Sequence, residues 1–430
     1  MQLNVLRRWL QLKVRRRWVQ LNVPRRPSRR EGACFALLVL SAVAAASGVS
    51  ADGVLSTTNT LFLEYGGPLR MTVFTPGVSG RIDLGDHVAF SAGWDADIVS
   101  GASVAVVDAP ASSIDAISTA SVTDLRNVGK ARLEFRDETT SLRLGYQYGT
   151  ESDYRSHSFD VSARTELFER NTAFEITYAR GFDTVCDLAQ DRAQNPVDRQ
   201  RLPTSDGCYG TAMDRVSRDV SLQTFQGSWS QAWAPVFSTQ LSFTAQLVDG
   251  FQSNPYRAVW LGRSSAQEHH PDFRARYAIG LGSRLWLKPL KAAVQLDLRA
   301  YRDTWDVASI TGELAWDQTI GGGLRLRVRG RYYKQTSATF FSDDYSRNPR
   351  GEFFTGDREL SAMSSVTVGG RIAWDVPANE EGEVLGFMSS FSLIGKFDYM
   401  IYDFTDFSYG AFGVPNNQAL VATASIEAGF

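Results

Sequence analysis

Residues 420–430 read Leu-Val-Ala-Thr-Ala-Ser-Ile-Glu-Ala-Gly-Phe. Every second residue back from Phe430, including Ala428 and Ile426, is apolar, whereas the residues between them are mostly small or polar. This period of two is typical of a β-strand with one apolar and one polar face. The segment also has the length of a tilted strand that crosses a hydrocarbon layer, about 9–11 residues. It is either the terminal strand of a membrane barrel or the edge strand of a soluble sheet.

The same alternation recurs through most of the chain, and its length decides between these readings. The alternating pattern extends over residues 387–401, whereas strands of globular sheets are usually only about 5–6 residues long. Pro76 and a change of phase between Leu222 and Phe225 predict β-bulges. We predict sixteen strands, at 59–66, 69–83, 87–98, 127–137, 140–150, 155–168, 171–182, 218–233, 237–249, 272–286, 291–304, 308–319, 323–335, 362–375, 386–402 and 418–430.

The predicted connections alternate in length. If Phe430 lies on the periplasmic side, all the long connections fall on the outer side, at 99–126, 183–217, 250–271, 336–361 and 403–417. Short periplasmic turns and long outer loops are typical of outer-membrane barrels. Aromatic residues at the predicted periplasmic strand ends would form an interfacial girdle: Phe168, Trp233, Phe237, Trp286, Trp374, Phe387 and Phe430.

These patterns predict an all-β fold, a closed antiparallel transmembrane β-barrel of about sixteen strands with long extracellular loops. The sheet must close because an open edge in lipid would leave N–H and C=O groups without partners. We expect the barrel in the bacterial outer membrane, surrounded by lipid and lipopolysaccharide. Phe430, Ala428 and Ile426 resemble the terminal signal that the barrel-assembly machinery recognises.

Residues 1–51 differ from the rest of the chain. Residues 1–30 contain three copies of a basic nonamer, which is either an RNA- or membrane-binding arm or, as we interpret it, an extension from a start codon assigned too far upstream. Residues 31–51 carry the apolar run and small residues of a secretory signal peptide. The remaining 52–430 form one predicted barrel domain. The formal net charge of −2 argues against a nucleic-acid partner.

Several motifs together resemble a known family: Asp97-Ile98-Val99-Ser100-Gly101-Ala102-Ser103, Ser152-Asp153-Tyr154-Arg155-Ser156, Asn171-Thr172, Ser342-Asp343-Asp344-Tyr345 and Gly356-Asp357-Arg358-Glu359-Leu360-Ser361. The family is an uncharacterised group of predicted bacterial outer-membrane barrels, catalogued as a domain of unknown function. Its genes often lie near those for a flavin transferase, a thioredoxin-like protein and a small lipoprotein. The resemblance implies a periplasmic redox protein or lipoprotein as a partner, and it transfers no catalytic residues.

The strongest candidate site is a row of four arginines that alternate with Leu324, Leu326, Val328 and Gly330: Arg325, Arg327, Arg329 and Arg331. Arginine facing lipid at mid-depth would cost about 2–4 kcal/mol, so the row should face the lumen. Glu313, Asp317 and Asp297 on neighbouring predicted strands can neutralise it. The row is therefore either a network of ion pairs or an anion-selective constriction.

Two smaller clusters complete the candidates. Cys186 and Cys208 lie in one predicted outer loop, and an even pair in an oxidising compartment predicts a disulfide. Another cluster could bind a metal: Glu268, His269, His270 and Asp272. Adjacent histidines point to opposite sides of a strand, so we interpret these residues as a solvated loop. We predict neither metal nor cofactor.

No catalytic triad can be assembled, because His157 and its neighbour Ser158 would face opposite ways on a strand. We therefore predict no enzymatic activity. A sixteen-strand barrel ordinarily leaves a water-filled interior, so the leading hypothesis is a pore or conduit for small polar solutes or a partner segment. The alternatives are a non-conducting docking barrel for an envelope redox system and, third, an outer-membrane enzyme.

Overall fold

The structure is a computed structural model. It describes residues 51–65, 71–100, 123–191, 193–202, 214–261, 264–345, 351–380, 382–407 and 417–430. The predicted basic extension and almost all of the predicted signal peptide lie outside the described residues, and so does Cys208.

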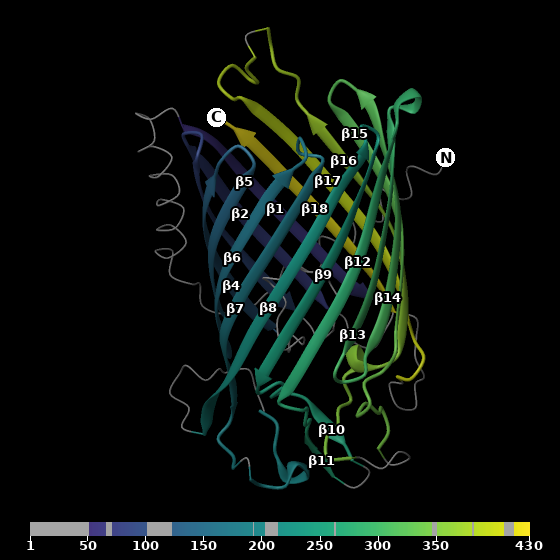
Figure 1. Ribbon diagram of the computed structural model, residues 1–430. Helices are drawn as coiled ribbons and strands as arrows, with labels where there is room; N and C mark the ends of the chain where they lie inside the picture. The colour runs from purple at the N-terminus through teal and green to yellow at the C-terminus, as the bar shows by residue number, and fades with distance from the viewer. Residues whose placement is uncertain are drawn as a thin grey trace, which may run out of the picture. The chain divides into compact units, whose positions relative to one another are not determined.

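Sixteen long antiparallel strands close into one barrel (Figure 1). In chain order they are β1 (Ala51–Tyr65), β2 (Thr72–Leu84), β3 (Val88–Ser100), β4 (Thr123–Arg136), β5 (Thr140–Thr150), β6 (Tyr154–Leu167), β7 (Thr172–Leu188), β8 (Arg215–Ala234), β9 (Phe237–Gly250), β12 (Phe273–Leu287), β13 (Ala292–Asp303), β14 (Ala308–Gly321), β15 (Leu324–Gln335), β16 (Met363–Asp375), β17 (Ser390–Phe404) and β18 (Asn417–Gly429).

The connections hold a few short elements. Strands β10 (Ala258–Trp260) and β11 (Ser265–Gln267) form a separate hairpin, and η2 (Pro196–Asp198), η3 (Lys288–Leu290) and η4 (Arg358–Leu360) are 3-10 helices. Among the residues described above, no helix is both long and apolar enough to cross a membrane.

The barrel closes where the first strand meets the last. Strand β1 pairs with β18 from Val54 opposite Gly429 to Tyr65 opposite Gln418, and with β2 on its other side. The backbone N–H of Phe430 donates to the Gly53 carbonyl at 2.8 Å, which extends this ladder by one residue. The predicted terminal strand is therefore the closing strand of the barrel.

All sixteen predicted strands are present, and their boundaries differ mainly at β1, which begins at Ala51 instead of residue 59. The early part of β1 lacks a clear apolar alternation, but it is held by ladders to both β2 and β18. The two predicted bulges are wrong, because the register runs unshifted past Pro76 and from Leu222 to Phe225. Leu222 faces the interior and packs in a small apolar cluster there, which explains the change of phase.

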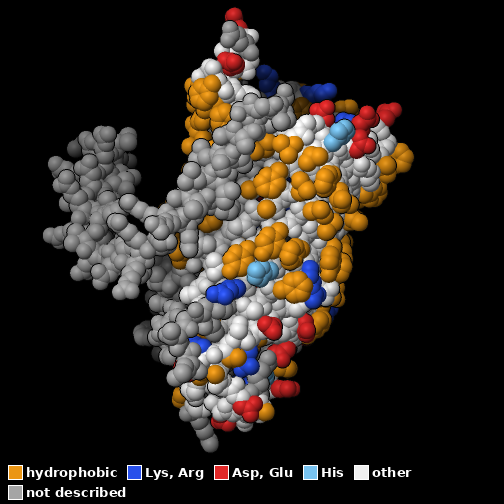
Figure 2. Space-filling model, turned by 90° about the vertical axis from the view of Figure 1, so that its left-hand side faces the viewer, with side chains coloured by type: hydrophobic (Ala, Val, Ile, Leu, Met, Phe, Trp, Pro, Cys, Tyr) orange, Lys and Arg blue, Asp and Glu red, His pale blue; other side chains and the backbone are white. Residues whose placement is uncertain are grey.

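The outer face of the barrel is an apolar belt. Large apolar side chains such as Val328, Leu314 and Ile176 are more than half exposed, and they alternate along their strands with polar residues. Figure 2 shows hydrophobic side chains gathered over the strands that face the viewer. All seven aromatic residues of the predicted girdle are exposed. The alternating polar face must then line the barrel interior.

The two ends of the barrel differ, as the connection lengths predict. Long connections follow β3, β7, β9, β15 and β17 at one end, at the bottom of Figure 1. The other end carries short turns such as those between β2 and β3 and between β14 and β15, together with the carboxyl terminus. Short turns mark the periplasmic end. The protein is an outer-membrane barrel, and its long loops surround the outer mouth.

Candidate functional site: the barrel interior and its outer mouth

The predicted arginine row lies along β15 and is paired with carboxylates from both sides. Arg325 forms an ion pair with Asp375 at 2.6 Å and Arg327 with Asp317 at 2.7 Å. Arg329 reaches Glu313 at 2.8 Å and Asp398 at 2.9 Å. These contacts agree with the interpretation of the row as a network of ion pairs.

A glycine allows the contact between Arg329 and Asp398 to cross a strand. Gly369 of β16 lies directly between Arg329 of β15 and Asp398 of β17. A Cβ atom at Gly369 would overlap the Asp398 carboxylate. On the opposite side of the barrel, Gly145 likewise lies between Arg132 and Asp160, and a Cβ atom at Gly145 would overlap the Asp160 carboxylate.

Asp297 joins the row only through a neighbour. The side chain of Gln295 donates to Asp297 at 2.5 Å, and its oxygen accepts from Arg327 at 3.3 Å. The sequence therefore places Asp297 on the correct face, and a glutamine between the two groups carries the contact. Arg331 shares this face, directly opposite Glu313.

A second network lies on the inner faces of β2 to β7. Positive and negative side chains alternate along it, and each lies within 3.8 Å of the next. In order they are Arg136, Asp83, Arg81, Glu134, Arg143, Glu175, Arg164, Glu166 and Arg170. The interior is thus highly charged, and much of this charge is neutralised locally.

Two outer loops, 251–272 and 336–362, are joined by a buried polar cluster around Glu268. The Glu268 carboxylate accepts from the Asn254 N–H at 2.6 Å, the Thr355 hydroxyl at 2.8 Å and Arg257 at 3.2 Å. Arg257 also pairs with Asp357 at 2.6 Å. Burial opposes ionisation of Glu268, but its electrostatic interactions with His270 and Arg257 outweigh this effect and lower the pKa of Glu268 to about 2.

The loops also contact inward-facing side chains on separate parts of the barrel wall. Arg358 of η4 forms a buried ion pair with Glu64 of β1 at 2.7 Å, and Gln267 of β11 donates to Asp187 of β7 at 3.0 Å. Gln335 of β15 donates to the Glu359 and Ser361 carbonyls. Because these anchors come from β1, β7 and β15, the loops fold inward across the outer mouth. We call this assembly of loops 251–272 and 336–362 the mouth cap.

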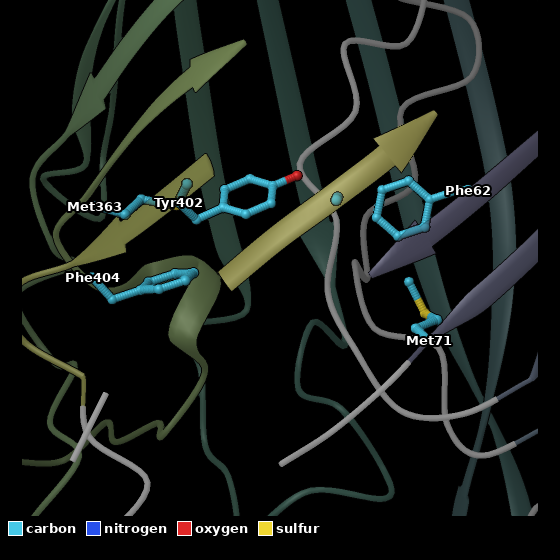
Figure 3. Close-up of a cluster of buried hydrophobic side chains, with 6 residues drawn as sticks. Phe62, Met71, Met363, Tyr402 and Phe404 are labelled. Carbon is cyan, nitrogen blue, oxygen red and sulfur yellow. The ribbon is translucent and has the colours of Figure 1, made fainter. Parts of the chain in front are cut away.

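An apolar cluster surrounds the anchor on β1. Phe62 and Met71 lie on one side of β18, and Met363, Tyr402 and Phe404 lie on the other (Figure 3). The guanidinium carbon of Arg358 lies over the Phe404 ring, 5.4 Å from the ring centre, within the range of a cation–π interaction. The buried charge therefore sits against aromatic surface, which keeps water away from the ion pair.

The remaining sequence-based candidates have different outcomes. Cys186 is fully buried and disulfide-bonded, but Cys208 lies outside the described residues, so their pairing stays a prediction. Phe430 stacks near Phe387, with 6.5 Å between the ring centroids. The role of Phe430, Ala428 and Ile426 in assembly also stays a prediction.

The interpretation of Glu268 and His270 as a solvated loop is wrong. Both residues are almost completely buried, and His270 packs edge-on against Trp305. No local pattern marks this burial, because it depends on the other loop, whose Thr355 lies 87 residues from Glu268 in the sequence. One available signal is that loop 336–362 contains the pairs Phe340-Phe341 and Phe353-Phe354, which indicates a loop with a core of its own.

Comparisons with known proteins find distant structural similarities and one family match. The solved structures that the barrel resembles include a bacterial polysaccharide outer membrane secretin, with 10% identity, a TM-score of 0.47 and coverage of 88% of this chain and 98% of that one. Another is the outer membrane protein OprD from Pseudomonas aeruginosa, with 9% identity, a TM-score of 0.41 and coverage of 89% and 95%. Likenesses this distant carry no argument about function.

A search of curated proteins finds no match. A family model described as "Protein of unknown function (DUF3570)" matches residues 32–385. This match spans most of the chain and agrees with the resemblance that the sequence motifs indicate. The chain belongs to the DUF3570 family of proteins of unknown function.

Proposed function

We propose that the protein is a pore for small polar solutes, with little preference between anions and cations. The observation that carries the proposal is the interior of the barrel, where charged side chains gather on the inner faces and pair with opposite charges. Sixteen strands ordinarily leave room for water inside a barrel. Paired charges keep such a lumen hydrophilic without creating a strong field of one sign.

Conductance of the purified mature protein in a planar bilayer tests this proposal. We expect discrete current steps and nearly equal permeability for K⁺ and Cl⁻ at low salt, where screening is weakest. Replacing both Arg327 and Arg329 by glutamate should shift the preference towards K⁺ in any protein that still folds. A strong anion preference in the wild type would contradict the paired network and support an anion-selective constriction.

The mouth cap favours a second candidate, a non-conducting barrel that docks a periplasmic partner. Its loops are anchored to inward-facing side chains on β1, β7 and β15. A Glu268→Gln variant separates the two candidates, because it loosens the cap without altering the barrel wall. If the variant conducts and the wild type does not, the protein is a pore that its cap closes. No conductance in either protein would favour the docking barrel.

The structure offers no support for an enzyme at the histidine that the sequence singles out. The His157 ring nitrogen lies 2.9 Å from the Tyr146 hydroxyl, and its ring packs against Tyr148. These partners are aromatic residues of the outer face, and His157 is paired with Phe182 on the next strand. We therefore propose a transport or docking role and no hydrolytic one.

A further inference from the structure

One arginine lies where the belt should be apolar. Arg180 is on the outer face of β7, and the neighbours on the same face of that strand are the exposed Tyr178 and Phe182. Other charged residues on the outer faces of the described strands lie at or near the outer strand ends: Arg155, Arg215, Asp219, Asp249, Arg302, Lys334 and Asp403. Within the described part of the barrel, Arg180 alone has large apolar residues on both sides.

Arg180 is directed towards the outer surface of the membrane. Its guanidinium carbon lies 5.1 Å from the centre of the Phe182 ring, and Phe182 is the next residue of this face towards the outer end. Long cationic side chains in lipid place their charge in this way, near the polar boundary. The charge therefore lies in the half of the belt that contacts the outer leaflet.

Polar groups lie beside Arg180 on β8 and outward of it on β6, whereas the apolar Phe159 of β6 pairs directly opposite it. Gln223 of β8 pairs directly opposite Arg180, and His157 of β6 pairs opposite Phe182. The Tyr146 hydroxyl lies 2.9 Å from His157, and Arg155 is the next residue outward on that face of β6. We call Arg155, His157, Arg180 and Gln223 the belt notch. Figure 2 shows basic and histidine side chains set among hydrophobic ones on the face that it presents.

The chemistry of the belt notch selects its ligand. Arginine binds phosphate through two parallel hydrogen bonds, and the amide and imidazole groups add further donors. A ligand that reaches this site must also carry acyl chains, since the surrounding wall is apolar. A second copy of the chain fits poorly, because the described strands offer no carboxylate at this depth on their outer faces.

We propose that the belt notch binds the phosphate of a lipopolysaccharide molecule of the outer leaflet, with its acyl chains along the β6 and β7 wall. The ligand class is a phosphorylated, acylated saccharide. This inference does not depend on whether the barrel conducts, because the site lies on the outer face and not in the lumen.

Binding of bisphosphorylated lipid A to the full mature barrel in detergent tests the proposal, with native mass spectrometry as the measurement. We expect Arg180→Leu to weaken this binding by about tenfold or more, the usual effect of losing a hydrogen bond to a charged group. Lipid A without phosphates should bind the wild type and the variant equally. Leucine suits the belt, so the variant should keep the heat-modifiable migration of a folded barrel.

Arg302→Leu is the matched control, since Arg302 is also an arginine on the outer face, far more exposed and paired with Asp306. It should leave lipid A binding unchanged. Equal binding of lipid A by wild type and Arg180→Leu would overturn the proposal. So would inorganic phosphate that competes fully with lipid A, because the site would then be one for free anions. If Arg180→Leu changed the oligomeric state of the barrel but not its lipid A binding, the proposal would be overturned in favour of a protein partner at the belt notch.

Discussion

The same ion pair, an arginine with a carboxylate, occurs in two different surroundings in this protein. On β15 the side chains of Arg325, Arg327 and Arg329 are between 27% and 52% exposed. In the mouth cap the Glu268 side chain is completely buried, and Arg358 and Glu64 are 7% and 3% exposed. Water can replace a lost partner in the lumen, but it cannot do so in the cap. The wall should therefore tolerate charge changes that the cap does not.

Neutralising the centre of the cap should give the largest effect. Glu268→Gln removes a completely buried carboxylate charge and leaves Arg257 paired with Asp357. Removing one partner of a buried pair typically costs about 3–5 kcal/mol. We expect the free energy of local opening of loops 251–272 and 336–362, measured by hydrogen exchange, to fall by that amount. Glu352→Gln changes an exposed carboxylate of the same loop and should leave exchange unchanged. Equal protection in both variants would show that packing alone holds the cap.

Acid should also weaken the mouth cap, because it protonates Glu268. The pKa of Glu268 lies near 2 in the folded protein, below its ordinary value of about 4.3 in an unfolded chain. Its stabilising contribution is thus present above pH 4.3 and is lost as the pH falls towards 2, by about 3 kcal/mol in total. Hydrogen exchange of 251–272, corrected for the intrinsic rate at each pH, should therefore accelerate between pH 5 and about pH 2. Glu268→Gln should lack this dependence.

Substitutions in the arginine row should have smaller effects on the free energy of unfolding. The effect should be smaller for an ion pair that is more exposed to solvent. Arg329→Gln removes contacts to both Glu313 and Asp398, and we expect it to lower the free energy of unfolding by about 1–2 kcal/mol. Arg325→Gln removes one half-exposed pair with Asp375 and should cost about 0.5 kcal/mol or less. Urea unfolding of both variants in the same detergent measures the difference. Equal decreases in the free energy of unfolding would mean that solvent exposure does not determine how much these ion pairs contribute to stability.

The barrel wall could be predicted because lipid imposes a local rule. Each strand must place apolar residues on one face, so a period of two identifies both the strand and the side to which Arg327 or Arg329 points. Of the two carboxylates that pair with Arg329, only one could be predicted from the sequence. Glu313 lies on the adjacent strand, but Asp398 lies two strands away and reaches Arg329 only because Gly369 has no side chain.

The mouth cap could not be predicted, because no repeating rule acts on it. Glu268 depends on Thr355, which is far away in sequence, and on a backbone N–H at Asn254 that any residue could supply. Polar residues in a long loop are usually solvated, and only the full set of contacts shows that these are not. The disulfide prediction relied on compartment and residue count, which identify Cys186 but say nothing of its surroundings.

The pairing of β1 with β18 has a consequence for biosynthesis. Thr58 and Ser425 share a hydrogen bond across a sequence separation of 367 residues. Until residues near 425 have been synthesised, β1 has only one of its two neighbours, and both ends of the growing sheet are open edges. Long-range pairings of this kind form slowly, and open edges pair readily with other chains. The nascent protein must therefore be kept from aggregation until translation is finished, and a prematurely terminated chain should be degraded.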